Sequence, residues 1–304
     1  MTSAANTPLK SVLSVLEQPR SNWIGDGFRV YDMFNYRKDT ELHTPFLLLH
    51  YTAPMQFEPN PHAERRGVGD HPHRGFETVT IVYDGEVEHR DSTGAGGIIA
   101  RGDVQWMTAG GGIMHKELHS QAFSEKGGPF EMVQLWVNLP AKSKMTPARY
   151  QNITAGSIAE VALPNDAGRV RVIAGELQGN KGPAQTHTPM HVWDVRLHAG
   201  KTAALPQPAG WTLTLLVQSG TVSVNGETAQ CGQLVTLGRD GSGLELQAQA
   251  GEDVRLLLMA GEPIDEPLVA SGPFVMNSKA EIAQAVSDFN SGKFGSMNAE
   301  ASVG

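Results

Sequence analysis

Short stretches rich in Val, Ile, Leu, Thr and aromatic residues recur along the chain, and turn-forming residues separate them. Such runs, bounded by Gly, Asp, Asn or Pro, are typical of β-strands. The 34 glycines and 18 prolines are consistent with many tight turns. The clearest candidate strands are residues 46–51, 77–83, 132–137, 169–173, 211–217, 221–224 and 254–259. The pattern predicts an all-β fold, either a barrel or a sandwich.

Two dipeptides directly after candidate strands predict hairpin turns. Asp84-Gly85 follows strand 77–83, and Asn225-Gly226 follows strand 221–224. Both residue types tolerate the positive φ that two-residue hairpin turns require. We therefore expect the chain to reverse direction and pair with itself at both places.

One helix is expected near the C-terminal end. Ser278 suits the N-cap position, and Glu281 three residues later completes a capping box. Ile282, Val286 and Phe289 fall on one helical face. This face is expected to pack onto the neighbouring domain rather than to carry chemistry.

The length of 304 residues, at roughly 150 residues per domain, predicts two domains. With 40% apolar residues, each domain can bury a core. Weak periodicity and small polar residues mark residues 142–164 as the connection. The predicted domains are 1–150 and 151–304.

An internal repeat supports the count of two domains. Residues 71–85 match residues 206–220 at a constant offset of 135, which pairs Gly75 with Gly210, Phe76 with Trp211 and Gly85 with Gly220. The same offset places Pro206 and Pro208 opposite two histidines of the first copy. The second copy is therefore expected to keep the scaffold and to lack what these histidines do.

Charge and cysteine content exclude several classes of function. The formal net charge is 24 − 32 = −8, which argues against direct nucleic-acid binding because phosphates must be met by clustered Lys and Arg. No apolar stretch approaches the roughly 18 residues of a membrane span, and no secretory signal is visible. The single cysteine, Cys231, excludes an intrachain disulfide and a Cys-based zinc site, and it is expected to be buried and inert. The expected location is the cytoplasm, or the nucleus in a eukaryotic host.

Four side chains in two blocks suit a metal ion. His71 and His73, and likewise His115 and Glu117, are two residues apart, so each pair points to the same side of a strand. Two such pairs on facing strands would bring together three imidazoles and one carboxylate. Ligands of this kind suit Fe(II), Mn(II), Ni(II), Cu(II) or Zn(II). A His-x-His pair alone is common, and histidines beside Gly and Pro often only satisfy loop hydrogen bonds; the second pair makes the metal site the stronger interpretation.

These blocks resemble the two-part cupin motif, and their detailed amino-acid sequence resembles that of the pirin family. The matching segments are His-Pro-His-Arg-Gly-Phe-Glu-Thr-Val (71–79), Gly-Glu-Val-Glu-His-Arg-Asp-Ser (85–92), Gly-Asp-Val-Gln-Trp-Met-Thr-Ala-Gly (102–110), Gln-Leu-Trp-Val-Asn-Leu-Pro (134–140), Glu-Pro (266–267), Ser-Gly-Pro-Phe-Val-Met-Asn (271–277) and Gly-Lys-Phe-Gly (292–295). The resemblance covers almost the whole chain. It implies two cupin (jelly-roll) barrels in tandem with a C-terminal helix, one metal ion, usually iron, in the N-terminal barrel and none in the C-terminal barrel.

The resemblance also assigns roles to individual residues. It places the metal ligands at His71, His73, His115 and Glu117, whereas the general cupin pattern would nominate Glu77 as the carboxylate. We expect Glu117 to be the ligand and Glu77 to support the site from outside it. The expected ion is iron(II), with Mn, Ni, Cu or Zn as alternatives.

Three functions compete at this point. Resemblance to pirins implies a quercetin 2,3-dioxygenase, which opens the central ring of a flavonol with O2 and releases carbon monoxide; Glu117 would then serve as ligand and as catalytic base. The second is a redox-sensing regulator that binds a transcription factor or a metabolic enzyme. The third is a scaffold that is metal-free or built around zinc, which does no oxygen chemistry. We favour the dioxygenase, with a flavonol-like substrate and O2 as its small-molecule partners.

Other residues near the blocks leave two interpretations open. His89 either hydrogen-bonds near the site or lies on a solvated face, and Arg74 either forms an outward salt bridge or contacts an anion. Met107, Met114 and Trp106 line a pocket or belong to the core. The remaining histidines are expected to be strand or loop residues: His43, His50, His62, His187, His191 and His198.

Overall fold

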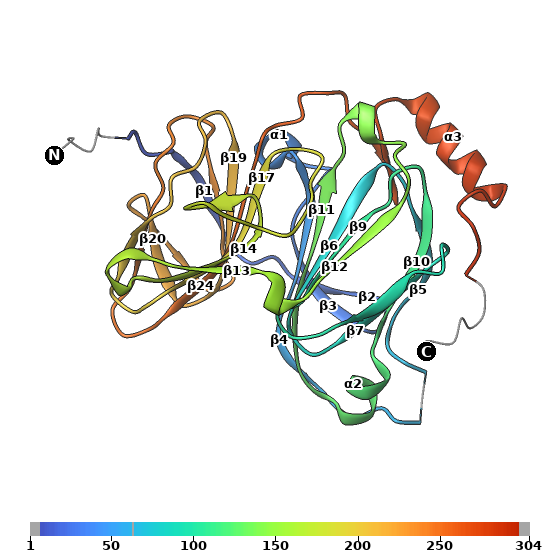
Figure 1. Cartoon of the computed structure of the whole chain (residues 1–304), viewed down its shortest axis with the longest axis horizontal. Helices are drawn as coiled ribbons and strands as arrows, with labels where there is room; N and C mark the ends of the chain where they lie inside the picture. The colour runs from blue at the N-terminus through green and yellow to red at the C-terminus, as the bar shows by residue number, and fades with distance from the viewer. Residues whose placement is uncertain (1–6, 63, 298–304) are drawn as a thin grey trace. The chain divides into compact units, whose positions relative to one another are not determined.

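The computed structural model describes residues 7–62 and 64–297, which form an all-β protein with one longer helix near the C-terminal end (Figure 1). These residues divide into two compact units. The first barrel comprises residues 19–38, 46–155 and 264–297, and the second barrel comprises residues 7–18, 39–45 and 156–263. The seven strands predicted from the sequence coincide with observed strands β4, β6, β11, β14, β19, β20 and β24.

The two units are discontinuous along the chain. The change of unit at residues 155 and 156 falls within the expected connection, residues 142–164. However, residues 7–18 and 39–45 belong to the second barrel and residues 264–297 to the first, unlike the sequential split into 1–150 and 151–304. The reason is strand pairing: β1 (Val12–Leu16) pairs with β22 (Leu234–Leu237), a long-range ladder that local composition cannot reveal.

The first barrel contains a seven-stranded and a four-stranded antiparallel sheet. In spatial order, the larger sheet consists of β12 (Arg149–Ile153), β9 (Val104–Thr108), β6 (Phe76–Asp84), β11 (Gly128–Asn138), β4 (Phe46–Phe57), β3 (Phe28–Asn35) and β2 (Ser21–Ile24). The smaller sheet consists of β5 (Gly67–His73), β10 (Ile113–His119), β7 (Val87–Asp91) and β8 (Gly96–Ile99). This unit also holds α2 (Gln121–Lys126), η1 (Ala141–Ser143), β25 (Val269–Ser271), β26 (Phe274–Met276) and α3 (Lys279–Asn290).

The second barrel repeats this arrangement. Its larger sheet consists, in order, of β1, β22, β19 (Thr212–Ser219), β24 (Val254–Gly261), β17 (Met190–Leu197), β14 (Gly168–Ala174) and β13 (Ala159–Ala162). Its smaller sheet consists of β18 (Thr202–Ala204), β23 (Glu245–Ala248), β20 (Thr221–Val224) and β21 (Glu227–Gln230). The short elements are α1 (Thr40–His43), η3 (Pro164–Asp166), β15 (Glu176–Leu177) and β16 (Asn180–Lys181), and η2 (Ala155–Ser157) spans the change of unit.

The internal repeat predicted from the sequence is therefore visible strand by strand. The edge strand β12 of the first barrel pairs with β9, and the edge strand β1 of the second barrel pairs with β22, the counterpart of β9. The other five strands of each larger sheet then follow in an equivalent order. One difference in connection is that β12 follows the other strands of its larger sheet in the chain, whereas β1 comes from the N-terminal segment. Two copies of one fold, each with both sheets, account for the length of the chain.

One of the two predicted hairpins is confirmed. Val224 pairs with Glu227 across Asn225 and Gly226, whose φ angles of 48° and 96° are both in the positive range that this turn requires. Asp84-Gly85 is not a hairpin turn, because β6 pairs with β9 and β11 while β7 pairs with β10 and β8. This turn instead carries the chain from one sheet to the other.

Helix α3 begins as predicted, but its buried face differs from the predicted one. The Ser278 hydroxyl accepts a hydrogen bond from the Glu281 backbone N–H, as in a capping box. The buried residues of α3 are Ala285 and Asp288, whereas Val286 and Phe289 are 41% and 37% exposed. The acidic side chain is buried because it pairs with Arg74, a partner that helical periodicity could not disclose.

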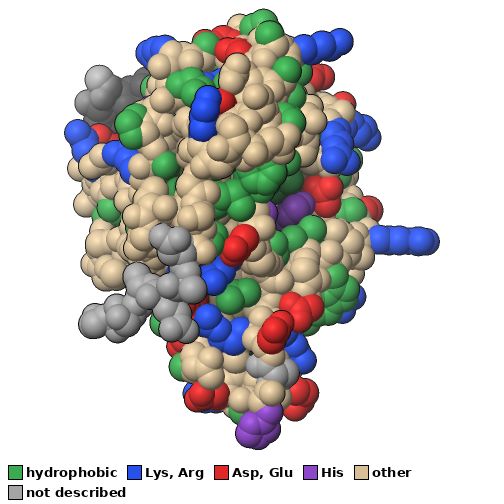
Figure 2. Space-filling view, turned by 90° about the vertical axis from the view of Figure 1, so that its right-hand side faces the viewer, with side chains coloured by type: hydrophobic (Ala, Val, Ile, Leu, Met, Phe, Trp, Pro, Cys, Tyr) green, Lys and Arg blue, Asp and Glu red, His purple; other side chains and the backbone are tan. Residues whose placement is uncertain are grey.

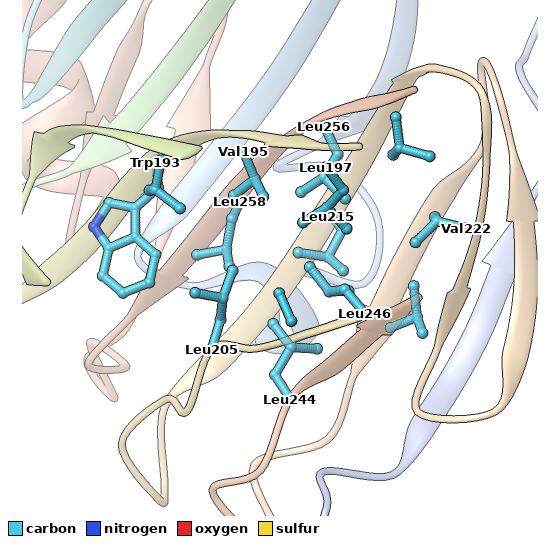
Figure 3. Close-up of a cluster of buried hydrophobic side chains, with 14 of the residues drawn as sticks. Trp193, Val195, Leu197, Leu205, Leu215, Val222, Leu244, Leu246, Leu256 and Leu258 are labelled. Carbon is cyan, nitrogen blue, oxygen red and sulfur yellow. The ribbon is translucent and has the colours of Figure 1, made fainter. Parts of the chain in front are cut away.

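In each unit, an apolar cluster joins residues from both sheets. In the first barrel one such cluster is Phe28, Val30, Phe57, Val82, Val87, Ile99, Phe123, Phe130 and Met132. The core of the second barrel is dominated by leucine and valine, with Trp193 at one end of the drawn cluster (Figure 3). Fully burying such a side chain stabilises the fold by roughly 1.5–3 kcal/mol, so these cores hold the two sheets together.

Candidate metal centre

Strand β10 lies between β5 and β7 and carries two of the four predicted ligands. His115 is opposite His71 of β5 on one side and opposite Asp91 of β7 on the other. The pairing of β10 with β5 shifts register between His115, which is opposite His71, and Glu117, which is opposite Val68. Alternation along β10 buries both His115 and Glu117 and leaves the residue between them partly exposed, as a period of two requires.

The three predicted histidine ligands lie together. The ring centroid of His115 is 4.1 Å from that of His71 and 4.6 Å from that of His73, and the two rings of β5 are 4.8 Å apart. One nitrogen from each of the three rings lies within 4.8 Å of the others. Among the four clustered histidines, which include His89, only His71 is partly exposed. A space-filling view of one face of the molecule shows a histidine side chain in a hollow beside hydrophobic and acidic side chains (Figure 2).

The ring nitrogens are arranged to offer lone pairs. His71 Nδ1 lies 2.8 Å from the Gly69 carbonyl, so it donates its proton there and leaves Nε2 as the acceptor. His115 Nε2 and His73 Nδ1 are buried and have no hydrogen-bond partner in the described part of the chain. Burial of a polar atom without a partner is costly. A cation would satisfy these nitrogens, so the residues fit a metal ion.

The imidazoles of His73 and His115 are neutral, as ligation requires. Burial lowers the pKa of His73 and His115 well below the usual value, and the neighbouring imidazoles lower it further. The carbonyl of Pro273 partly opposes this effect at His73. No proton therefore has to leave these rings before a metal ion binds near neutral pH.

The fourth predicted ligand, Glu117, forms a second group with His115 and His89 whose ligand atoms lie within 4.8 Å of one another. Gln134 Nε2 donates to both carboxylate oxygens, at 3.0 and 2.9 Å, and the Thr80 hydroxyl donates to Oε1 at 3.3 Å. Burial raises the pKa of Glu117, while His71 and these hydrogen bonds oppose the shift. Sequence reasoning missed Thr80 and Gln134 as partners, because each lies on a strand of the larger sheet that is distant from Glu117 along the chain.

Glu77 is buried in the same barrel but has a different partner. Its Oε1 accepts a hydrogen bond from the Thr108 hydroxyl at 2.6 Å, and Glu77 belongs to neither metal-ligand group found among the described residues. Burial raises its pKa to about 7, and the hydrogen bond from Thr108 opposes the rise. Its partner is thus a threonine of β9 rather than one of the four predicted ligands.

His89 is buried, with 1% of its surface exposed, so the solvated interpretation is wrong. Its Nε2 lies 2.6 Å from His115 Nδ1, and its Nδ1 lies 2.7 Å from the Tyr150 hydroxyl. Tyr150 was not identified from the sequence because β12 is far from the histidine blocks along the chain. Pairing of β12 with β9 brings it to the site.

Arg74, next to His73, is also buried. It donates to Asp288 of α3 at 2.9 Å and to the Gly111 carbonyl at 2.7 Å, and its guanidinium lies 4.6 Å from the Phe294 ring centroid. Arg74 is therefore an inward ion-pair residue that holds the C-terminal segment beside the site. It is neither an outward salt-bridge residue nor an exposed anion contact.

Of the remaining predictions, some are confirmed and one, the burial of Cys231, is wrong. Met107 and Trp106 are fully buried core residues. Cys231 is exposed, not buried as expected, because it follows the end of β21, and its thiol contacts the Gln218 carbonyl at 3.1 Å. The other histidines lie in neither metal-ligand group found among the described residues: His43, His50, His62, His187, His191 and His198.

The second barrel has three leucines and one glutamine where the first has the cluster. The Leu205 N–H donates to the Leu244 carbonyl at 2.9 Å, the cross-strand relation that His71 has with His115. By the same register, Gln207 corresponds to His73 and Leu246 to Glu117. The offset in this strand is 205 − 71 = 134 rather than 135, so leucine and glutamine, not the prolines, stand at these places. Leu205, Leu244 and Leu246 are part of the core (Figure 3).

The chain is similar to known proteins both in sequence and in structure. A pirin model matches residues 27–137, and a model of the pirin C-terminal cupin domain matches residues 192–295. A relative from Pseudomonas aeruginosa named "putative quercetin 2,3-dioxygenase" is 53% identical over 286 residues, which are 94% of this chain and 99% of the relative. A "pirin-like protein" of Solanum lycopersicum is 37% identical and covers 97% of this chain and 96% of its own length. A crystal structure of quercetin 2,3-dioxygenase from Acinetobacter baumannii has a TM-score of 0.91 at 49% identity and covers 96% of this chain and 100% of that chain.

Two cupin barrels, one with a buried group of histidine and glutamate side chains, define the class of this protein. The chain belongs to the pirin family. Among the helices in the described part of the chain, none combines the length and the apolar character of a membrane span.

Proposed function

We propose that this chain is a pirin-type dioxygenase that uses one divalent metal ion, iron(II), to open the central ring of quercetin-like flavonols with O2 and release carbon monoxide. The observation that carries the proposal is the group of three imidazoles whose ligand nitrogens lie within 4.8 Å of one another, with the Glu117 carboxylate beside His115. The names of the Pseudomonas and Acinetobacter relatives support the same reaction.

The proposed ligands are His71, His73, His115 and Glu117. Three nitrogen donors and one carboxylate suit iron(II) and also Mn(II), Ni(II), Cu(II) or Zn(II), so elemental analysis decides between them. A bound iron ion would supply Lewis acidity and a path for electrons between flavonol and O2. The leucines of the second barrel offer no such donors, which supports one ion per chain.

Glu117 is the proposed acceptor of the flavonol 3-hydroxyl proton. Its carboxylate is buried within 4.8 Å of ring nitrogens of His115 and His89, where it can accept a proton as a general base. Gln134 and Thr80 hold the carboxylate in one orientation, so its oxygens do not turn away from the substrate. These two residues therefore fix the place at which the proton is taken up.

Aromatic side chains beside His73 suit a flat polyphenol. The His73 ring centroid lies 5.1 Å from that of Phe76 and 5.3 Å from that of Trp136. Tyr36 stacks on Trp136, with centroids 6.1 Å apart and an interplanar angle of 12°. The partly exposed rings of Trp136 and Tyr36 can stack on such a ligand, whereas Phe76 is fully buried.

The test begins with metal analysis of protein purified without added metal. Anaerobic titration with quercetin follows, and then O2 is added while carbon monoxide is measured. We expect about one iron per chain, a red-shifted flavonol spectrum and release of carbon monoxide. His115→Leu should lose metal and turnover, whereas His119→Gln, on the same strand but bonded to the Gly27 carbonyl, should keep both. Iron-loaded protein that binds quercetin but releases no carbon monoxide would rule the reaction out.

A further inference from the structure

His115 and two side chains behind it form a continuous series of polar contacts. His115 Nδ1 lies 2.6 Å from His89 Nε2. The Tyr150 hydroxyl lies 2.7 Å from His89 Nδ1 and farther, at 3.3 Å, from Nε2. The histidines belong to β10 and β7 of the smaller sheet, and Tyr150 belongs to β12 of the larger sheet. The contacts therefore connect the two sheets of the first barrel behind the candidate metal centre.

The Tyr150 end of this series of contacts determines which atom donates at each step. Burial raises the pKa of the Tyr150 hydroxyl, and the nearby carboxylate of Asp91 raises it further, so the hydroxyl keeps its proton. Asp91 Oδ1 accepts from the Thr93 N–H and hydroxyl and from the Ala95 N–H, whereas its Oδ2 is buried and has no hydrogen-bond partner in the described part of the chain. An ionised carboxylate only accepts. The hydroxyl proton of Tyr150 is therefore attracted toward Asp91, and the oxygen is left to accept a hydrogen bond from His89.

The tautomers of both histidines follow from this direction. His89 carries its proton on Nδ1, where it donates to Tyr150, and so its Nε2 is an acceptor. His115 must then carry its proton on Nδ1 and donate it to His89. The lone pair of His115 is consequently on Nε2, the buried atom without a partner in the described part of the chain.

We propose that His89 is a positioning residue, which together with Tyr150 and Asp91 fixes His115 in the tautomer and ring orientation that present Nε2 to a metal ion. The inference rests on the proposed function only in that it assumes a metal ion at this site. It also decides between the two metal-ligand groups: both nitrogens of His89 are engaged, so His89 has no lone pair for a metal and is not a ligand.

The second barrel provides an independent observation. Val224 is opposite Leu246 there, as His89 is opposite Glu117 in the first barrel. Val12 of β1 is opposite Leu237, as Tyr150 of β12 is opposite Met107. The barrel without the four ligand side chains thus also lacks the polar chain behind them. Polar residues that only stabilised the cupin scaffold would have no reason to disappear together with the ligands.

Cobalt(II) binding to the metal-free full-length chain, without flavonol or O2, tests the proposal. Visible absorption gives the dissociation constant. Loss of a residue that orients a metal-bound histidine typically weakens binding by about 10–100-fold, so we expect a loss of that size for His89→Leu. His89→Gln should bind within about 3-fold of the unchanged chain, because its amide oxygen accepts from His115 and its NH2 group donates to Tyr150. Tyr150→Phe should weaken binding by about 3–10-fold, since His89 loses the acceptor that orders it.

Tyr51→Phe is the matched control, because Tyr51 is buried in the same barrel and donates to Glu131 away from the site. It should leave cobalt affinity unchanged. A thermal melt of each metal-free variant is the second measurement. If His89→Leu lowers Tm but leaves the cobalt dissociation constant unchanged, the residue is only structural and the proposal is overturned.

The tautomer itself can be observed in the zinc-loaded chain with 15N-labelled histidine, since zinc is diamagnetic. Long-range 1H–15N spectra should show both His89 and His115 protonated on Nδ1. A metal-bound His89, or His115 protonated on Nε2, would contradict the proposal. Cobalt binding with the expected variant effects but without carbon monoxide release would overturn only the dioxygenase, whereas absence of cobalt binding would overturn both.

Discussion

The side-chain amide of Gln134 donates to both carboxylate oxygens of Glu117, at 3.0 and 2.9 Å. Gln134 belongs to β11 of the larger sheet and Glu117 to β10 of the smaller sheet, so the contact crosses the barrel interior. The glutamine thereby orients a buried carboxylate that, among the described residues, has no basic side chain as a hydrogen-bond partner. This relationship leads to the first prediction.

Gln134→Leu should weaken cobalt(II) binding by about 10–100-fold, because Glu117 loses the donor that orients it toward the ion. Titration of the metal-free chain by visible absorption measures the change. Gln105→Leu is the matched control, since Gln105 is buried in the same barrel and contacts Asn152 instead. Equal affinities for the Gln134 and Gln105 variants would show that the carboxylate needs no such support.

Glu117→Gln should separate ligation from catalysis. The amide oxygen can still meet a metal ion but cannot take up a proton, so we expect appreciable metal content and a kcat lower by about 100-fold or more. Metal analysis and carbon monoxide release measure the two properties. Glu131→Gln, another buried glutamate of this barrel, should keep full activity. Unchanged turnover in Glu117→Gln would remove the base role.

The raised pKa of Glu77 predicts a pH-dependent stability. Its pKa is about 7 in the folded chain against an ordinary 4.5, so between these pH values the folded chain holds a proton that the unfolded chain has lost. The free energy of unfolding should therefore fall as pH rises through this window, by about 3 kcal/mol in total, and Glu77→Gln should not share this loss. Urea unfolding from pH 4.5 to 8 measures the difference between the two proteins.

That difference should grow up to about pH 7 and stay constant above it. Thr108→Val should move the upper limit of the window to higher pH, because the Thr108 hydroxyl stabilises the ionised carboxylate. A constant difference between the Glu77→Gln and unchanged proteins across the whole range would mean that Glu77 ionises normally in the fold.

The leucines of the second barrel should contribute stability rather than chemistry. Leu246→Ala removes a fully buried side chain and should cost about 3 kcal/mol of unfolding free energy, while the exposed neighbour Gln247→Ala should cost below about 0.5 kcal/mol. Urea unfolding gives both values. The cobalt stoichiometry should remain one per chain in both variants. Loss of cobalt binding in Leu246→Ala would indicate that the metal ion binds in the second barrel and would contradict a site in the first.

The sequence predicted features that depend on neighbours along the chain. The spacing of two residues places His71 beside His73 and His115 beside Glu117, because alternate strand residues share a side. The capping box of α3 and the Asn225-Gly226 hairpin depend on hydrogen bonds and φ angles within a few residues. The internal repeat was visible for the same reason, since both copies keep their turn glycines. Local geometry was enough for all of these.

Only the tertiary structure decided what depends on pairing between distant segments. Long-range ladders assign β1 to the second barrel, bring Tyr150 of β12 behind His89 and aim Gln134 at Glu117. The ion pair with Arg74 selects the buried face of α3, and sheet pairing makes Asp84-Gly85 a connection between sheets. The free energy of such contacts belongs to residues far apart in the chain, and no periodicity within one segment carries that information.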